Sequence, residues 1–181
     1  VIELTTANAL SYNFSMLKLK CDEPLRETYS TYTFGAGEFA MAGAGKLGMP
    51  KIENTGFVGN LSGNANATLT FKLVAEKDCT VTLSAAVTGR RQGARKFTAG
   101  FVPTVNGVEV VSDAIVPQGE QSTEWTVSYR VTIGEIHLKA GENTLTFTVP
   151  ESAANTTDAS NFDYISIMSM FGVTCTSSWL S

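Results

Sequence analysis

Side chains of the types that bind sugars lie in or beside the polar loops of the sequence. An aromatic ring face stacks on the C–H face of a pyranose, while amides and guanidinium groups hydrogen-bond its hydroxyls. The chain offers one aromatic, five amides and an arginine cluster at such places: Trp125, Asn60, Asn64, Asn66, Asn155, Asn161, Arg90, Arg91 and Arg95. Asparagine is also common in loops because it favours turns, and an arginine cluster is more often a solvated face. Composition alone therefore indicates glycan recognition only weakly.

Residues that serve the commonest catalytic and zinc sites are scarce. The single histidine, His137, lies between Ile and Leu just before a turn, which predicts an exposed strand position. One imidazole would have to serve any histidine-dependent triad or histidine-rich metal site alone. The three cysteines, Cys21, Cys79 and Cys175, lack the paired short spacing of a zinc site. We expect isolated thiols, with a disulfide between Cys79 and Cys175 as the alternative.

Acidic residues in the same loops leave an enzymatic function open. Hydrolysis of a glycosidic bond needs two carboxyl groups facing each other at about 5 to 10 Å. The candidates are Asp113, Glu120, Glu124, Glu151 and Asp158. All lie in polar loops, whereas a catalytic pair needs firmer support. A small jelly-roll glycoside hydrolase or lyase is therefore the less favoured hypothesis.

Length and composition describe the molecule that must position these side chains. With 181 residues, 43% hydrophobic and 17% charged, the chain can bury one core as a single domain. Thirteen Lys and Arg against seventeen Asp and Glu give a net charge of −4, which argues against nucleic acid as a partner. No apolar run reaches the roughly 18 residues of a membrane span. We expect a soluble, secreted or cell-surface protein with no membrane partner, whose export signal has been removed.

From residue 68 onward, apolar and polar residues alternate with a period of two between Gly and Asn turns. The alternation predicts strands at residues 68–75, 79–88, 97–105, 108–112, 125–138, 143–149 and 161–170. Asn106–Gly107 is a strong hairpin signal, and the change of parity after Gly134 predicts a β-bulge. No segment has an apolar stripe at helical spacing. We therefore expect an all-β antiparallel β-sandwich of the jelly-roll type.

Alternating strand directions sort the connections onto two ends of this sandwich. One end receives the long loops at residues 56–67, 88–96, 112–124 and 150–160. The other end receives the short turns at residues 75–78, 106–107 and 139–142. Long loops on a rigid β scaffold usually carry binding, so the long-loop end is the expected functional face. Tyr129 shares the parity of Val127 and Val131 and is expected in the core.

The order of motifs resembles carbohydrate-binding module families 6 and 35, which have a galactose-binding-like β-sandwich fold. The resemblance rests on the Gly-Phe-Val-Gly turn at 56–59, the LKAGENTL hairpin at 138–145 and the Asn-Phe-Asp-Tyr-Ile ending at 161–165. It covers residues 34–170, which leaves 1–33 as an N-terminal extension or extra strand and 171–181 as a tail. It implies a non-catalytic module that binds a polysaccharide or oligosaccharide and is tethered to a larger secreted glycoside hydrolase or surface protein.

The resemblance also implies roles for individual residues. Asn161 matches an asparagine that hydrogen-bonds sugar hydroxyls, and Trp125 lies in the region that supplies a stacking aromatic. Asn60 stands where many members have a second aromatic and would bind hydroxyls instead. Arg90, Arg91 or Arg95 would contact the ligand if it is a uronide.

Members of these families commonly hold a structural calcium ion through a Glu-x-Glu pair in the first strand and an Asp near the last. Asp163 matches that Asp, and Glu38 matches the second Glu. Ala36 stands where the first Glu would be, which removes one of the oxygen ligands that calcium prefers. The resemblance thus implies a calcium site that is weakened or lost.

A third class of function is a structural or adhesion module of a larger surface protein, in which the sandwich is a spacer. Asn60, standing in place of an aromatic, favours this hypothesis. A closed loop end with Trp125 buried would distinguish it from a binding module.

Overall fold

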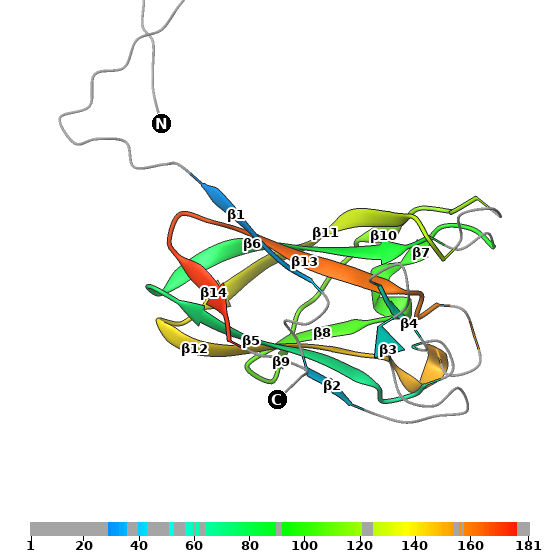
Figure 1. Cartoon of the computed structure of the whole chain (residues 1–181), viewed down its shortest axis with the longest axis horizontal. Coiled ribbons are helices and arrows are strands. Elements are labelled where there is room, and N and C mark those ends of the chain that lie inside the picture. Colours follow the sequence, from blue (N-terminus) through cyan, green and yellow to red (C-terminus); the bar gives the residue numbers. More distant parts are fainter. Residues whose placement is uncertain are drawn as a thin grey trace, which may run out of the picture.

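The computed structural model shows two antiparallel β-sheets packed face to face (Figure 1). It describes residues 29–35, 40–42, 51–52, 57–59, 61, 64–89, 92–120, 125–153, 156 and 158–176. Within these residues, no helix is long and apolar enough to cross a membrane. The all-β jelly-roll sandwich expected from the sequence is confirmed.

The first sheet has the strand order β11-β6-β13-β4-β3, with β1 also paired to β13. Its strands are β1 (Ser30–Gly35), β3 (Lys51–Ile52), β4 (Val58–Gly59), β6 (Cys79–Thr88), β11 (Ser128–Leu138) and β13 (Phe162–Ser169). The central position of β6 brings β11 and β13, which are far apart in sequence, to its two sides.

The second sheet has the order β14-β5-β12-β8-β9, with β2 also paired to β5. Its strands are β2 (Ala40–Ala42), β5 (Thr68–Ala75), β8 (Val102–Val105), β9 (Val108–Glu109), β12 (Gly141–Thr148) and β14 (Val173–Cys175). Strands β1 and β14 lie at the two ends of the described chain, so the paired strands run from Ser30 to Cys175.

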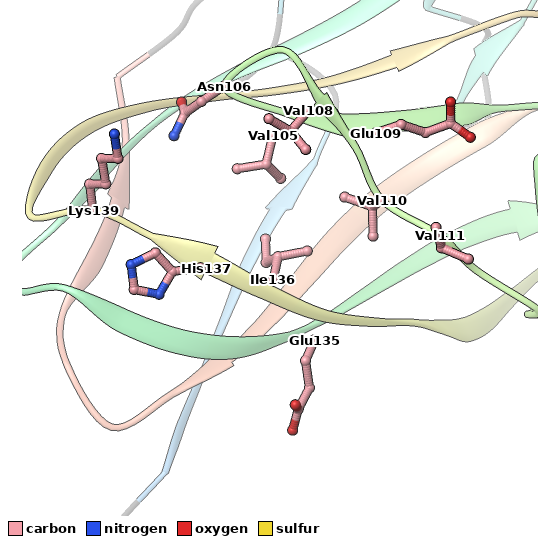
Figure 2. A pocket seen from close by; sticks show the side chains of 10 residues that line it. All are labelled: Val105, Asn106, Val108, Glu109, Val110, Val111, Glu135, Ile136, His137 and Lys139. Atoms are coloured by element: carbon pink, nitrogen blue, oxygen red, sulfur yellow. The ribbon is translucent and has the colours of Figure 1, made fainter.

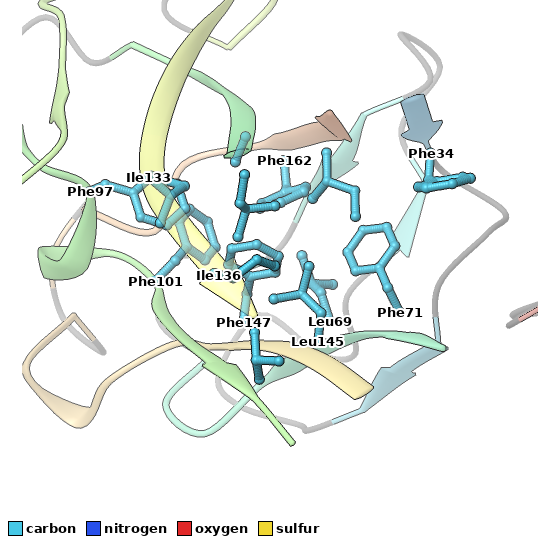
Figure 3. Packing of buried hydrophobic residues seen from close by; sticks show 14 of the residues in the cluster. Phe34, Leu69, Phe71, Phe97, Phe101, Ile133, Ile136, Leu145, Phe147 and Phe162 are labelled. Atoms are coloured by element: carbon cyan, nitrogen blue, oxygen red, sulfur yellow. The ribbon is translucent and has the colours of Figure 1, made fainter. Parts of the chain in front are cut away.

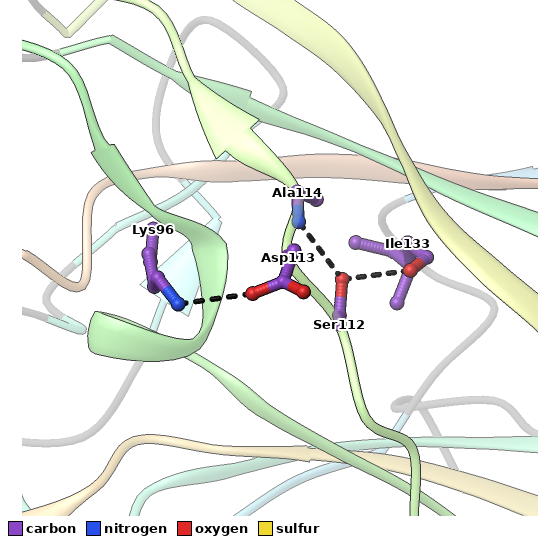
Figure 4. A network of polar contacts seen from close by, with 5 residues as sticks. All are labelled: Lys96, Ser112, Asp113, Ala114 and Ile133. Carbon is purple, nitrogen blue, oxygen red and sulfur yellow. Dashed lines mark hydrogen bonds and ion pairs between the residues drawn. The ribbon is translucent and has the colours of Figure 1, made fainter.

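A short ladder of β7 (Arg95–Lys96) and β10 (Ile115–Val116) stands apart from the two sheets. Two short 3₁₀ helices, η1 (Phe97–Ala99) and η2 (Glu151–Ala153), complete the described elements. The segment before β10 is fastened to β11 because the Ser112 hydroxyl donates to the Ile133 carbonyl at 2.7 Å (Figure 4). On the exposed side, Lys96 and Asp113 form an ion pair at 2.9 Å.

Alternation along the strands produces one core between the sheets (Figure 3). The buried positions of β5 and β12 fall on every second residue, because successive side chains of a strand point to opposite faces. Five phenylalanine rings meet in this core with centroid separations of 5.1 to 6.3 Å: Phe71, Phe97, Phe101, Phe147 and Phe162. Burying such rings makes the largest contribution to holding the two sheets together.

Two local predictions are confirmed. The hairpin residues Asn106 and Gly107 have φ angles of 51° and 81°, which is the left-handed backbone that this two-residue turn requires. The pairing of β11 with β6 shifts between Thr132 and Gly134, and Gly134 has a φ of 152°. The bulge allows Ile133 and Ile136 both to point into the core.

Two strand boundaries differ from the sequence expectation. Residues 97–99 form η1 rather than the start of a strand, and the strand expected from residue 125 begins at Ser128. Val127 consequently lies in a turn and is 42% exposed instead of pointing inward.

Cys79 and Cys175 are not bonded to each other, so the expected alternative of a disulfide between them is wrong. Cys79 begins β6 in the first sheet, and Cys175 ends β14 in the second. Cys79 Sγ faces Ser169 Oγ at 4.0 Å. Cys21 lies outside the described residues.

Strand register confirms the division of loops between two ends. Thr68 pairs with Thr148, and Ser128 pairs with Thr88, at the end that carries the long connections. The short turns follow Ala75, which pairs with Gly141 at the opposite end.

Candidate functional site

A hydrogen-bonded frame around Thr88 supports the long-loop end. Thr88 donates its N–H to the Asn161 carbonyl at 2.9 Å, and Asn161 donates its N–H to Thr88 Oγ1 at 3.1 Å. The Ser160 hydroxyl donates to the Thr88 carbonyl at 2.6 Å. Thr88 and Ser160 are fully buried, so Asn161 emerges from a well-supported backbone.

Trp125 lies in the turn that precedes β11, and the structure brings it next to Asn161. The Asn161 amide Nδ2 donates to the Trp125 carbonyl at 3.0 Å. The Trp125 side chain is 37% exposed, so part of its surface is open to a ligand. The two residues that the sequence singled out for stacking and for hydroxyl binding are therefore neighbours.

Ser128 closes the same turn on its other side. Its hydroxyl donates to Asp163 Oδ2 at 2.6 Å. Asp163 sits where the pairing of β13 with β6 shifts between Phe162 and Tyr164, and such a bulge re-aims the side chain of the extra residue. We call residues 125–128 the tryptophan turn, because bonds from Asn161 and Asp163 hold both of its ends.

Val127 is a candidate contact that sequence reasoning missed. It is exposed beside Trp125 in the tryptophan turn, where an apolar side chain would extend the surface offered by the ring. The alternating pattern placed it in the core because the boundary of a strand is invisible to periodicity alone. A turn signal at Thr126 would have been needed to find it.

Tyr129 is half-buried rather than enclosed in the core. A Cβ on Gly89 would lie 2.8 Å from its ring atom Cε2 and 2.8 Å from the Gly119 backbone nitrogen. Gly89 and Gly119 thus let two long loops approach each other against the tyrosine ring. Tyr129 belongs neither to the buried core cluster nor to the side chains packed against it, so the expectation of a core position is wrong.

Arg95, one of the three arginines considered for an acidic sugar, is buried rather than exposed in a loop. It is only 7% exposed, and its guanidinium donates to the Asp158 carbonyl at 2.9 Å and to Ser160 Oγ at 2.6 Å. Its role is to tie the loop that precedes β13 to the end of β6. Asn60, Arg90, Arg91 and Glu38 lie outside the described residues, and so does Glu124.

The described residues alone do not fit a calcium site. Among them, no group of three or more His, Cys, Asp or Glu side chains lies close enough to hold a metal ion. Asp163 contributes one carboxylate, and its Oδ2 already accepts the Ser128 hydroxyl. The calcium site stays a prediction that depends on Glu38.

Two of the acidic residues proposed for hydrolysis have structural partners. Asp113 pairs with Lys96, and Asp158 Oδ2 accepts the Thr156 hydroxyl at 2.9 Å. Neither side chain stands opposite another carboxylate in these contacts.

A groove of about 560 Å³ lies on the edge of the sandwich, away from the tryptophan turn (Figure 2). It runs between the β8–β9 hairpin and the last residues of β11. Its lining residues include four valines, namely Val105, Val108, Val110 and Val111, and the polar Glu109, Glu135, His137 and Lys139. His137 is exposed on β11, as the sequence predicted. The lining of this groove includes none of the side chains expected to bind sugar.

The comparisons with known proteins identify the fold. No protein-family model and no curated protein sequence matches the chain. A family 35 carbohydrate-binding module from an environmental isolate has a similar structure, with 21% identity, a TM-score of 0.56, and coverage of 81% of this chain and 98% of that one. A family 35 module solved in complex with a disaccharide containing glucuronic acid gives 17% identity, a TM-score of 0.55, and coverage of 80% and 97%.

The same fold also occurs inside a longer chain. The GH26-CBM35 β-(1,4)-mannanase of Podospora anserina matches with 17% identity and a TM-score of 0.52, over 81% of this chain and 28% of the enzyme. At these identities the similarity establishes the fold. The protein therefore has the galactose-binding-like β-sandwich fold of family 35 carbohydrate-binding modules, as the sequence resemblance predicted.

Proposed function

We propose that the protein is a non-catalytic carbohydrate-binding module that recognises a polysaccharide or oligosaccharide at its long-loop end. The observation that carries the proposal is the contact between Trp125, whose side chain is partly exposed, and Asn161 at 3.0 Å. An aromatic face beside a polar amide is the combination that sugar binding uses. Its location at the loop end of a family 35 fold supports the same conclusion.

In this proposal, the Trp125 ring stacks on one sugar ring and Asn161 binds a hydroxyl of that sugar. The Asn161 Nδ2 is engaged with Trp125, and among the described contacts its Oδ1 accepts no hydrogen bond. The Oδ1 atom is therefore the one that receives the hydroxyl. Asn60, Arg90 and Arg91 extend the site, and the two arginines make an acidic sugar a candidate ligand, as in the neighbour solved with a glucuronic acid disaccharide.

We further propose a secreted setting in which the module is tethered to a glycoside hydrolase. The mannanase that shares the fold supports this proposal, because the similar region occupies 28% of that enzyme. Binding would then hold the catalytic domain near its substrate and increase its effective concentration there. A calcium ion at Asp163 and Glu38 belongs to the proposal as a stabilising element only.

A binding screen with a matched pair of variants tests the function. The wild-type protein is run through affinity gels that contain neutral or uronic polysaccharides, with and without a calcium chelator. Trp125→Ala should weaken retention about tenfold or more, because it removes the stacking face while keeping the carbonyl that Asn161 binds. Tyr29→Ala removes an aromatic that is 53% exposed at the start of β1 and should leave retention unchanged.

Three results would contradict parts of the proposal. Retention on no polysaccharide favours the structural or adhesion module. Equal retention of Trp125→Ala and wild type rejects the stacking residue. Release of reducing sugar by the protein alone revives the hydrolase hypothesis.

A different result would support the calcium site: loss of binding only in the samples that contain the chelator.

A further inference from the structure

The chemistry of the contact between Asn161 and Trp125 fixes how the amide is oriented. A backbone carbonyl only accepts hydrogen bonds, so the Asn161 atom that faces the Trp125 oxygen at 3.0 Å must be the nitrogen. The donor end of the amide is therefore committed to the protein. The acceptor end points away from that bond.

The two partners of this bond differ in how firmly the rest of the protein holds them. Asn161 is bonded through its own N–H and its own carbonyl to Thr88, a fully buried residue. Trp125 lies in a turn outside the sheets, and its side chain is partly exposed. The bond therefore transfers the rigidity of the sheet to the tryptophan turn.

A second bond does the same at the other end of the turn. Ser128 on β11 donates to Asp163 on β13, and these two strands lie on opposite sides of β6. The bond consequently bridges across the middle strand.

We propose that Asn161 and Asp163 are positioning residues that hold the tryptophan turn in its binding conformation before the sugar arrives. Asn161 fixes the backbone of Trp125, and Asp163 fixes Ser128 at the other end. Because the Nδ2 end of the same amide holds the turn, the stacking face and the Oδ1 acceptor keep a fixed relation to each other. Order established before binding lowers the entropy that binding would otherwise cost.

The effect on sugar affinity rests on the proposed function, whereas the effect on the free protein does not. The experiment therefore measures the ligand-free protein first, by ¹⁵N relaxation of the backbone amides of residues 125–127. Asn161→Asp replaces the donor with an acceptor of the same shape, and Asn161→Ala removes both ends. Both should lower the order parameters of the turn from a rigid value of about 0.85 toward about 0.6.

Ser128→Ala removes the donor to Asp163 and should loosen the same residues, which keeps the test valid if either Asn161 variant fails to fold. Gln92→Ala is the matched control, because it removes an exposed amide from a neighbouring loop. Affinity for the polysaccharide retained in the gel screen should fall about three- to tenfold in Asn161→Asp, although that variant keeps an acceptor at Oδ1.

Unchanged order parameters in folded Asn161 and Ser128 variants would overturn the proposal. If the Asn161 variants then still lose affinity, Asn161 acts as a direct sugar ligand and has no positioning role. A loosened turn with undiminished affinity would also overturn it. If the turn loosens and neither wild type nor variant binds any polysaccharide, positioning is supported and the proposed function fails.

Discussion

At the scale of single residues, Gly100 shows how closely the support of the site is packed. A Cβ at this position would overlap the backbone carbonyl of Asp158, the same group that accepts the Arg95 Nε–H. Backbone cannot move aside as the tip of a long side chain can. The absence of a side chain at Gly100 therefore lets η1 lie against the loop that leads to β13.

We predict that Gly100→Ala lowers the free energy of unfolding by about 1 to 3 kcal/mol, the usual cost of overpacking. Urea denaturation followed by fluorescence measures this change. Gly172→Ala is the control, because its new Cβ would meet Glu76 Oε2 at 3.4 Å, an ordinary van der Waals distance. Equal stability of the two variants would show that the contact with Asp158 relaxes without cost.

The contact between Asn161 and Trp125 marks the limit of what residue patterns reveal. Motif order singled out both residues, and strand direction placed them at the same end. The hydrogen bond itself joins positions 36 apart in sequence and depends on where β13 pairs beside β6. Arg95 shows the same limit, since nothing in its sequence context indicates that it is buried against Asp158 and Ser160.

At the scale of elements, the β8–β9 hairpin is tied to β12 by the side chain of its own turn residue. Asn106 Nδ2 donates to Asn143 Oδ1 at 2.9 Å, and Asn106 Oδ1 accepts the Thr144 N–H at 2.8 Å. Asn106 also adopts a positive φ of 51°. One residue thus supplies both the turn geometry and the attachment.

Two substitutions separate these contributions. Asn106→Gly keeps the turn geometry and loses the two hydrogen bonds, so it should cost about 1 to 2 kcal/mol of unfolding free energy. Asn106→Ala also forces a Cβ into the left-handed region and should cost about 1 kcal/mol more. Thermal and urea unfolding of both variants measure the difference. If both variants lose the same stability, the left-handed backbone carries no cost here.

The sequence predicted an element where the residues themselves carry a local signal. It did not predict element boundaries that depend on contacts with distant residues. The Asn106–Gly107 turn and the Gly134 bulge leave a mark in the residues themselves, because left-handed backbone and a change of parity are local events. The start of β11 at Ser128 and the turn η1 leave none. Ser128 contacts Asp163, and Gly100 at the end of η1 packs against Asp158, and both of these partners lie far away in the sequence.

At the scale of the whole molecule, both sheets recruit strands from the two ends of the described chain. β1 pairs with β13 along six residues, and β14 pairs with β5 through residues 173–175. Val173 in β14 is fully buried and belongs to the common core. The sandwich is therefore completed by residues that lie beyond the range covered by the family resemblance, 34–170.

We predict that ending the chain at Gly172 destabilises the entire sandwich rather than only its edge. Removing Val173 from the core forfeits about 1.5 kcal/mol or more of burial, and residues 73–75 of β5 lose their backbone partner on one side. For a chain of this size, each kcal/mol corresponds to about 2 to 4 °C in Tm, so the midpoint should fall by at least about 3 °C. Because both sheets share one core, circular dichroism and tryptophan fluorescence should report the same lowered midpoint. A chain ending at Thr176 retains β14 and should unfold like the full chain; an unchanged Tm on ending at Gly172 would instead mean that β14 is a dispensable tail.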